Sequence, residues 1–436
     1  MMFSKKNSQA DIVKEYTTRE KTCGLAIGVI AIVFSLAIMH GDTTLIEPGM
    51  QRLVAIPNYL AMLVLMAEIV MNPQGFRLYL PLFIAWLFHW FLDGFHVAPG
   101  VDISIQASTL ILIFLFCMMT SRVWHYGFRV YRLFLIFSSF FGIIAFISFI
   151  TGIIQPLETV DYYNKSGGEN ALYIVYPFSY LFLGLQDGIE AVRLCGLFNE
   201  PGYFGTILAL ALVADGFNMR SIGNWMMLLA GCFTLSFAFF VLILLYWAIR
   251  AIRKIKVLFS IVAFSALFLF VVLPKIPEDS PAGWLAQRFA YNKEEKKLAG
   301  DDRTTSAFDM YWDQAVRDGS IVFGKGGGFF NNKDVGSLSC KKVIVEHGIV
   351  FSFLLWGMLF FACLHFKRNN VTWWALLICF FVSVYQRPSV FLFSYMIVLF
   401  GGIKNIDALL SNKKIKDSKI IQKKLIKEHE NSYMCV

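Results

Sequence analysis

The sequence predicts an all-α polytopic membrane protein. Of its 436 residues, 57% are hydrophobic and only 16% are charged, whereas soluble domains carry about 25% charged residues. Apolar runs close to the ~20 residues that cross a bilayer recur along the chain. The runs are continuous and do not alternate between apolar and polar residues, so a transmembrane β-barrel is excluded.

Eleven apolar runs are candidate membrane spans. They cover residues 23–40, 53–71, 76–92, 102–120, 130–154, 203–219, 224–249, 257–273, 344–366, 371–386 and 389–403. The run 224–249 has Thr234 and Ser236 near its middle. We expect it to break there into two segments that enter the bilayer and return, since irregular backbone at that depth is tolerated only where protein or a wet cavity covers it. About 12 membrane segments are therefore expected.

Basic clusters predict which loops are cytoplasmic, because lysine and arginine are enriched on that side. The clusters are Arg122, Arg129 and Arg132; Arg250, Arg253, Lys254 and Lys256; Lys367 and Arg368; and the tail 404–436, with eight lysines against four acids. They place both termini in the cytoplasm and account for much of the net charge of +9, which is therefore no sign of nucleic-acid binding. The polar first 22 residues lack a basic region with a cleavage site, so we expect no cleavable signal peptide.

Two long loops then face outward from a single integral membrane domain, residues 1–436. The first, 155–202, carries six acids and two bases, and its apolar stretch 171–185 is expected to lie on the membrane. The second, 274–343, carries eleven lysines and arginines against ten acids. Long ordered loops usually carry function, so candidate site residues are expected in these two.

The first loop ends in "RLCGLFNEPGYFG", residues 193–205. Pro201 suits the first turn of a helix, and Asn199 or Glu200 suits its cap. Arg193 is then either a snorkelling arginine at the entry of a span or a functional cation.

The second loop contains "DDRTTSAFDMYWDQAVRDGSIVFGKGGGFFNN". We expect a helix that includes Asp309, Tyr311, Trp312 and Asp313. The turn 323–330, "FGKGGGFF", can aim backbone N–H groups and Lys325 at an anion, or it is a flexible glycine loop. It lacks the spacing of a phosphate-binding P-loop, so a nucleotide site is rejected.

Four segments in this order resemble the O-antigen polymerase and O-antigen ligase superfamily, with the Wzy-type polymerases the closer fit. They are "RLCGLFNEPGYFG", "RTTSAFDMYW", "FGKGGGFF" and "VEHGIVFSFLLW", and the resemblance covers residues 190–360. It implies a GT-C-like membrane glycosyltransferase that needs no metal and uses undecaprenyl-diphosphate-linked oligosaccharide on the periplasmic face. Its functional arginines map to Arg193 and Arg303.

The chain departs from the ligase pattern at one position. Ligases carry a histidine about eleven residues before the glycine of the "GI" that opens the next span, and Ser337 stands there in this chain. Glu346 and His347, directly before Gly348, are therefore the candidate general bases. His347 is equally suited to be an interfacial histidine at the start of a helix.

The chemistry of such a transfer independently favours arginine. An expelled diphosphate needs positive charge, which guanidinium groups supply in permanently charged, bidentate form. No cofactor is expected, because no His, Asp and Glu cluster in the sequence has metal-ligand spacing. Glu200 and Lys325 are candidate substrate contacts, and aromatic side chains suit sugar faces, although membrane interfaces also enrich them. The aromatic candidates are Tyr162, Tyr163, Trp284, Tyr291, Tyr311 and Trp312.

The sequence thus predicts an O-antigen polymerase of the bacterial inner membrane, with a chain-length regulator and a flippase as partners and no nucleic acid. An O-antigen ligase and a flippase of the same lipid-linked oligosaccharide are the alternatives. A transporter should carry charged residues inside the bilayer. The predicted spans hold few charges near their middle, Glu68 being an exception, so the sequence favours the enzyme over the flippase. Whether Cys195 and Cys340, both in outer loops, form a disulfide stays open.

Overall fold

The computed structural model describes residues 16–36, 50–99, 101, 107–163, 170–186, 189–252, 306–331, 339–367, 369–388 and 390–411, with isolated positions between 254 and 298 and at 333. Most of the predicted span 257–273, together with Arg303, Ser337 and the tail from 412, lies outside the described residues.

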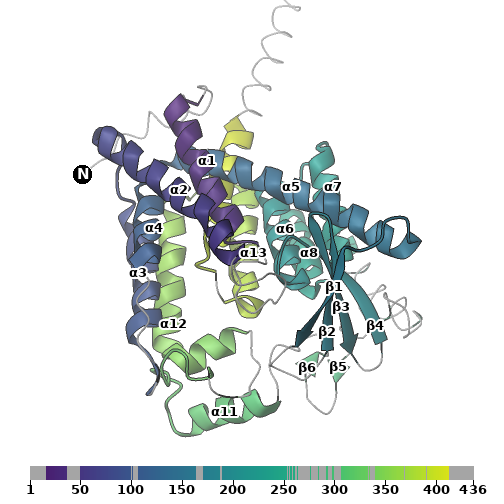
Figure 1. Ribbon diagram of the computed structural model, residues 1–436. Helices are drawn as coiled ribbons and strands as arrows, with labels where there is room; N and C mark the ends of the chain where they lie inside the picture. Colours follow the sequence, from purple (N-terminus) through teal and green to yellow (C-terminus); the bar gives the residue numbers. More distant parts are fainter. Residues whose placement is uncertain are drawn as a thin grey trace, which may run out of the picture.

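The described chain is mostly helical, as predicted (Figure 1). Its first helices are α1 (Thr18–Val33), α2 (Met50–Met71), α3 (Leu80–Phe95), α4 (Ala107–Met118) and α5 (Ser121–Thr151), with a short turn of 3-10 helix (Pro73–Gly75) after α2. The later helices are α6 (Pro201–Ala214), α7 (Ile222–Phe233), α8 (Phe237–Ala251), α11 (Ser306–Arg317), α12 (Cys340–Leu364) and α13 (Val371–Gln386). The last helix, Phe393–Ser411, begins as α14 (Phe393–Met396) and passes through a π-helical turn (Ile397–Gly401).

Within the described residues, three helices are long and apolar enough to cross a membrane: Ser121–Thr151, Cys340–Leu364 and Phe393–Ser411. Seven further apolar helices are shorter, with 10–17 residues. This helix set is that of a membrane-embedded protein.

Small residues let the helices approach closely. A methyl group on Gly24 of α1 would lie 2.7 Å from Tyr126 Cβ of α5, and one on Gly28 would lie 2.7 Å from Val130 Cγ1. The Gly24–Gly28 spacing is the small-xxx-small pattern that brings membrane helices together. Gly401 does the same for the last helix, where an added methyl group would lie 2.5 Å from Phe128 Cβ.

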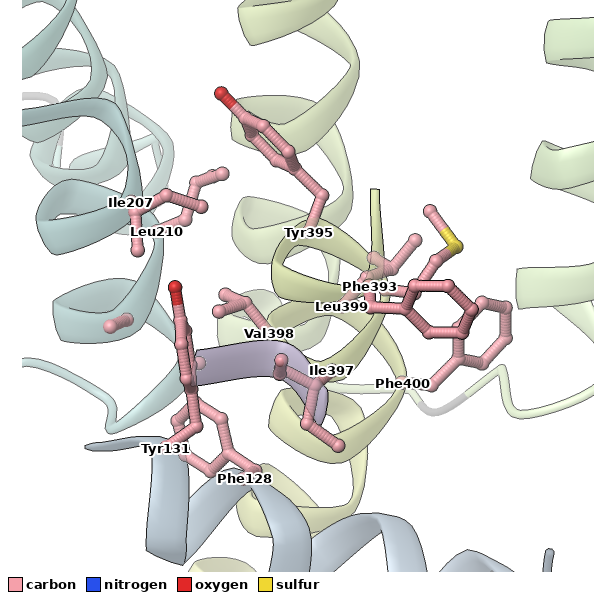
Figure 2. Close-up of a cluster of buried hydrophobic side chains, with 14 of the residues drawn as sticks. Phe128, Tyr131, Ile207, Leu210, Phe393, Tyr395, Ile397, Val398, Leu399 and Phe400 are labelled. Carbon is pink, nitrogen blue, oxygen red and sulfur yellow. The ribbon is translucent and has the colours of Figure 1, made fainter. Parts of the chain in front are cut away.

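The bundle core lies where α5, α6 and the last helix meet. Figure 2 shows buried side chains from all three helices: Phe128 and Tyr131 of α5, Ile207 and Leu210 of α6, and Phe393, Tyr395, Ile397, Val398, Leu399 and Phe400 of the last helix. Every residue of α6 is buried, so α6 is a central helix that neighbours enclose on all sides.

The predicted break in the run 224–249 is confirmed. Helix α7 ends at Phe233, α8 starts at Phe237, and Leu235 between them has a φ of 47°. The break lies beside Gly205 in the second turn of α6, where an added methyl group would lie 2.7 Å from Thr234 Oγ1. The other ends of the pair lie together near the end of α6, because Asn224 Nδ2 donates to Asp215 Oδ2 (2.7 Å) and Arg250 Nη1 to Gly216 O (3.5 Å). The pair therefore enters the bundle and returns.

Basic residues of the predicted cytoplasmic clusters lie at one end of the bundle, here called the basic end. Their contacts there join Arg122 to Glu20 (2.7 Å), Arg132 to Asp215 (3.1 Å) and Arg250 to Gly216, and place Lys404 over the ring of Phe366 (4.1 Å). Glu68 is also bound here, 3.6 Å from Arg19, at the end of α2. It is therefore not the mid-membrane charge that the sequence suggested.

The opposite end, here called the sheet end, carries a feature that the prediction missed. Residues expected to form a loop make a four-stranded antiparallel meander: β1 (Glu158–Tyr163), β2 (Asn170–Tyr176), β3 (Ser179–Gln186) and β4 (Ile189–Gly196). The stretch 171–185 forms a hairpin of this sheet, so it does not lie on the membrane as an unpaired segment. The expectation of an all-α chain is wrong here, because these β-branched and aromatic residues satisfy their backbone groups by pairing strands.

Candidate functional site

The glycine turn, residues 323–330, lies against the start of α12 and the end of α3. Its backbone N–H groups donate from Lys325 to Val345 O (2.8 Å), from Gly326 to Glu346 O (2.8 Å) and from Gly327 to His96 O (2.6 Å). Val97 and Gly327 also form an isolated β-bridge. The turn thus joins two segments that lie far apart in the sequence.

The carboxylate of Glu346 is buried beside the glycine turn. It is only 8% exposed, and the backbone of Gly328 and Phe330 acts on it electrostatically. The sequence pattern suggested a ligand anion for the N–H groups of this turn, whereas those of Lys325, Gly326 and Gly327 donate to carbonyl groups of the protein itself. Glu346 as the general base stays a prediction.

Lys325 also has a partner within the protein. Its Nζ lies 2.9 Å from Asp318 Oδ2. Hydrogen bonds from Ser320 and Lys325 hold the pKa of the Asp318 carboxyl well below its usual value, so this partner is ionised at neutral pH. Lys325 would have to leave Asp318 to bind a substrate anion.

The predicted helix in the second loop is confirmed as α11, and it places Tyr311 and Trp312. Tyr311 packs edge-on against the rings of Phe329 and Phe330, with ring centroids 5.9 and 5.8 Å apart. Trp312 packs on the same small apolar cluster and has Lys341 Nζ 5.6 Å from its ring. Both aromatic residues are half-buried and serve first to fix α11 on the glycine turn and α12; α11 projects from the lower side of the helices in Figure 1.

Gly348 separates the first two turns of α12 from the rest of the helix. Its φ of 86° and ψ of 160° are nearly exclusive to glycine. Beyond it, the N–H groups of Ile349 and Val350 donate to the carbonyls of Ile321 (2.9 Å) and Val322 (3.1 Å). The kink therefore seats residues 320–324 against α12 directly after His347.

Replacing Gly348 with alanine should destabilise the protein by ~2 kcal/mol or more, because it combines positive-φ strain with a clash. The added methyl group would lie 2.4 Å from the backbone carbon of Phe323. Thermal unfolding of the detergent-purified protein measures the change. Gly357→Ala is the matched control in the same helix: nothing lies within 4 Å of its added methyl group, so stability should rise by ~0.5–1 kcal/mol. Equal unfolding midpoints for the two variants would contradict this account of the kink.

Three histidines and an aspartate meet where α3 and α12 approach each other. His89 Nδ1 lies 3.2 Å from Asp93 Oδ2, and His347 Nε2 lies 3.7 Å from Asp93 Oδ1. His347 Nδ1 lies 3.4 Å from His96 Nδ1. Only His347 of this group was predicted from the sequence, although the i,i+4 spacing of His89 and Asp93 was a signal for a polar helix face.

Arg193, on β4, braces the break between α7 and α8. Its Nε donates to the Thr234 carbonyl at 3.1 Å, and the side chain is half-buried. Arg193 and Glu200 both lie close enough to Cys195 to act on its thiol electrostatically, and burial raises the pKa of that thiol. The structure therefore brings these two predicted site residues together at the entry of α6.

Glu200 stands at the N-cap position of α6, but its side chain makes no capping hydrogen bond. Both of its carboxylate oxygens instead accept from the guanidinium of Arg387, at the end of α13. Arg387 was not predicted as a site residue, although an arginine before Pro388 between two apolar runs was a signal. Its side chain is 12% exposed, and its Nε is buried without a hydrogen-bond partner among the described residues.

The loop 387–392 links the arginine group to the histidine group. Arg387 opens the loop, and the ring of Phe391 packs on His89 with centroids 4.7 Å apart. Both groups thus lie at the sheet end. The remaining predicted catalytic residue, Arg303, lies outside the described residues.

Cysteines and metal-ligating residues add no further site in the described part of the chain. Cys195 is buried, and both Cys195 and Cys340 are free thiols, so the possible disulfide is not formed. No group of three or more His, Cys, Asp or Glu side chains among the described residues has the arrangement of a metal site.

Comparisons with protein-family models, with curated protein sequences and with solved protein structures find no match to this chain. The chemistry of the arginine and histidine groups at the sheet end therefore carries the functional inference.

Proposed function

We propose that the protein is an O-antigen polymerase, a membrane glycosyltransferase that joins undecaprenyl-diphosphate-linked oligosaccharide repeat units at the periplasmic face of a bacterial inner membrane. One observation carries the proposal: guanidinium groups and a histidine group that can move a proton lie at the same end of an apolar helix bundle. Arg193 and Arg387 supply the first, and His96 and His347 supply the second.

The arginines suit the leaving group of this reaction. Breaking the bond between the anomeric carbon and the phosphate oxygen leaves both electrons on the diphosphate, whose growing charge needs a fixed positive partner. Arg387 already binds the planar carboxylate of Glu200 through two donors, the bidentate geometry that also suits phosphate. Arg193 and Glu200 both act electrostatically on the Cys195 thiol, which places Arg193 at the same entry of α6. Arg303 is proposed as the third guanidinium.

The histidines suit activation of the acceptor. The attacking sugar hydroxyl must lose its proton as the glycosidic bond forms, and histidine is the side chain most often used for that step near neutral pH. Tyr311 and Trp312, which pack beside the glycine turn, and Lys325, which belongs to it, are proposed to contact the sugar chain.

The topology that this function requires is GT-C-like, with about 12 membrane segments of which α7 and α8 form a returning pair. The basic end would face the cytoplasm and the sheet end the periplasm. A flippase that delivers the repeat units and a regulator of chain length would be partners in the same membrane.

Single cysteines should report this orientation in whole cells. In a cysteine-free background, Thr159→Cys, at an exposed position of β1, should react with an impermeant thiol reagent without lysis. Arg220→Cys, at the exposed turn before α7 near the basic end, is the matched control and should react only after lysis. Labelling of Arg220→Cys in intact cells, with labelling of Thr159→Cys only after lysis, would contradict the proposal that the sheet end faces the periplasm.

Polymerisation should survive chelation of divalent ions, because arginines are proposed to neutralise the diphosphate. Purified protein in nanodiscs should elongate lipid-linked repeat units at an unchanged rate in EDTA. Loss of activity that one divalent ion restores would contradict this mechanism.

A deletion strain tests the function directly. Loss of a polymerase leaves single repeat units on the lipid A core, whereas loss of a ligase leaves none there. Loss of a flippase also leaves none, with the units retained inside the cell. Single repeats that become a full ladder when the gene is restored are the expected result; bare core would reject the polymerase.

A further inference from the structure

Both ring nitrogens of His347 face other side chains. Its Nε2 lies toward Asp93 Oδ1 and its Nδ1 toward His96 Nδ1, at 3.7 and 3.4 Å. A general base has to present a lone pair to the hydroxyl that it deprotonates. His347 is only 8% exposed, whereas His96 is half-buried, so the accessible imidazole of the pair is that of His96.

The charge of Asp93 decides how protons are arranged along these groups. A carboxylate accepts hydrogen bonds, so it favours the His347 tautomer with its proton on Nε2. His347 Nδ1 then accepts from the Nδ1–H of His96, and the remaining lone pair lies on His96 Nε2. The 3.7 Å separation is long for a hydrogen bond, but contacts of this kind often tighten only when substrate binds.

We propose that His96 is the general base of the transfer reaction and that His347 and Asp93 are positioning residues behind it. The inference rests on the proposed glycosyltransferase function. The acceptor hydroxyl gives its proton to His96 Nε2 while its oxygen bonds to the anomeric carbon. The bond from that carbon to the phosphate oxygen breaks, and the diphosphate leaves with both electrons. The resulting His96 imidazolium is stabilised through His347 by the carboxylate of Asp93.

The glycine turn fixes the two histidines relative to each other. Gly327 N–H binds the His96 carbonyl, and Gly326 N–H binds the carbonyl of Glu346, the residue before His347. A methyl group on Gly327 would lie 3.2 Å from both His347 Cε1 and the His96 carbonyl oxygen. The ring of His96 also packs edge-on against Phe351, with centroids 5.5 Å apart. These contacts give the turn a catalytic purpose: it sets the distance between the rings.

The charged and titratable groups near His96 belong to the segments packed around it. They are His89 and Asp93 of α3, Lys342, Glu346 and His347 of α12, and Lys325, paired with Asp318, at the glycine turn. Burial lowers the pKa of His96, so the ring is neutral and able to accept a proton at neutral pH. In the proposed relay the negative charge of Asp93 favours the His96 imidazolium, so its removal should lower the pKa of His96 further.

The first test measures initial rates across pH with purified protein in nanodiscs. The probe is lipid-linked repeat units extracted from the strain that lacks this gene. His96→Ala should lower the rate by about a hundredfold or more. Asp93→Asn should shift the acid limb of the pH profile to lower pH. His347→Gln keeps a hydrogen-bond acceptor behind His96, so it should retain more activity than His347→Ala. It also tests the role of His347 if the alanine variant folds poorly. Exposed His365, at the end of α12, provides the control His365→Gln.

The second test needs no substrate. Diethyl pyrocarbonate modifies neutral imidazoles, and mass spectrometry locates the modified histidine. The pH midpoint for modification of His96 should fall in Asp93→Asn and His347→Ala and stay unchanged in His365→Gln. Unchanged midpoints in both relay variants, or a wild-type rate from His96→Ala, would overturn the proposal. If the wild-type protein does not polymerise the probe, the proposed polymerase function is rejected. The pH midpoints of His96 modification still show in that case whether Asp93 and His347 act on His96.

Discussion

Replacing Arg193 with alanine should lower polymerisation by about a hundredfold or more, because removal of one charge that stabilises a leaving group costs several kcal/mol. Arg303→Ala should have an effect of similar size. The measurement is complementation of the deletion strain, read as the ladder of polymer lengths, with the abundance of each variant in the membrane measured alongside. A full ladder from both alanine variants at normal abundance would falsify the catalytic role.

The structure gives Arg193 a second task that the variants have to separate. Its Nε binds the Thr234 carbonyl at the break between α7 and α8. Arg193→Gln keeps an N–H donor for that carbonyl but has no charge, whereas Arg193→Lys keeps a charge without the planar fork. We expect glutamine to retain the fold without the ladder and lysine to recover part of the ladder. A full ladder from Arg193→Gln would make Arg193 a structural brace.

Removing one partner of the Arg387–Glu200 pair should destabilise the protein by ~3–5 kcal/mol, because the other charge is left uncompensated in a largely buried place. The two side chains are 12% and 30% exposed. Arg387→Met and Glu200→Met should each lower the unfolding temperature and the abundance in the membrane. The double variant should recover most of this loss, since apolar pairs often replace buried ion pairs at little cost.

Activity of the double variant separates two uses of the pair. If Arg387 serves only to hold α13 to the entry of α6, the double variant should make a full ladder. If its guanidinium also binds the diphosphate, the double variant should be folded and abundant but make long chains at less than about one hundredth of the wild-type rate. We expect the second result. The Lys404–Asp407 pair at the basic end, separated by 3.4 Å, offers a matched double replacement that should leave the ladder intact.

Local features of the chain were predictable where one physical cause dominates. Long apolar runs form helices because no other structure except a closed barrel satisfies the backbone in lipid. The break at Thr234–Ser236 followed from the two polar residues near the middle of a long apolar run, and the helix at Ser306–Arg317 followed from its composition. The sheet was missed because the apolar stretch 171–185 fits a buried strand and a membrane-lying segment equally well.

The composition of the site was only partly predictable. Arg193, Glu200, Glu346 and His347 stood out because polar residues beside apolar runs are conspicuous. Their partners Arg387, Asp93 and His96 did not stand out in the sequence, because which side chains pair depends on which helix ends meet in the fold.

The sequence by itself determined that this is a helical membrane protein, that its charge is gathered in specific segments, and that Arg193 and Arg303 lie in long loops rather than inside spans. Only the tertiary structure decided that N–H groups of the glycine turn bind backbone carbonyls of α12 and of His96 in place of a ligand, and that Asp93, His347 and His96 form one series of contacts. The physical reason is distance along the chain. Composition and periodicity act over one or two turns, whereas His96 and His347 come together only when α3, α12 and the glycine turn pack against one another.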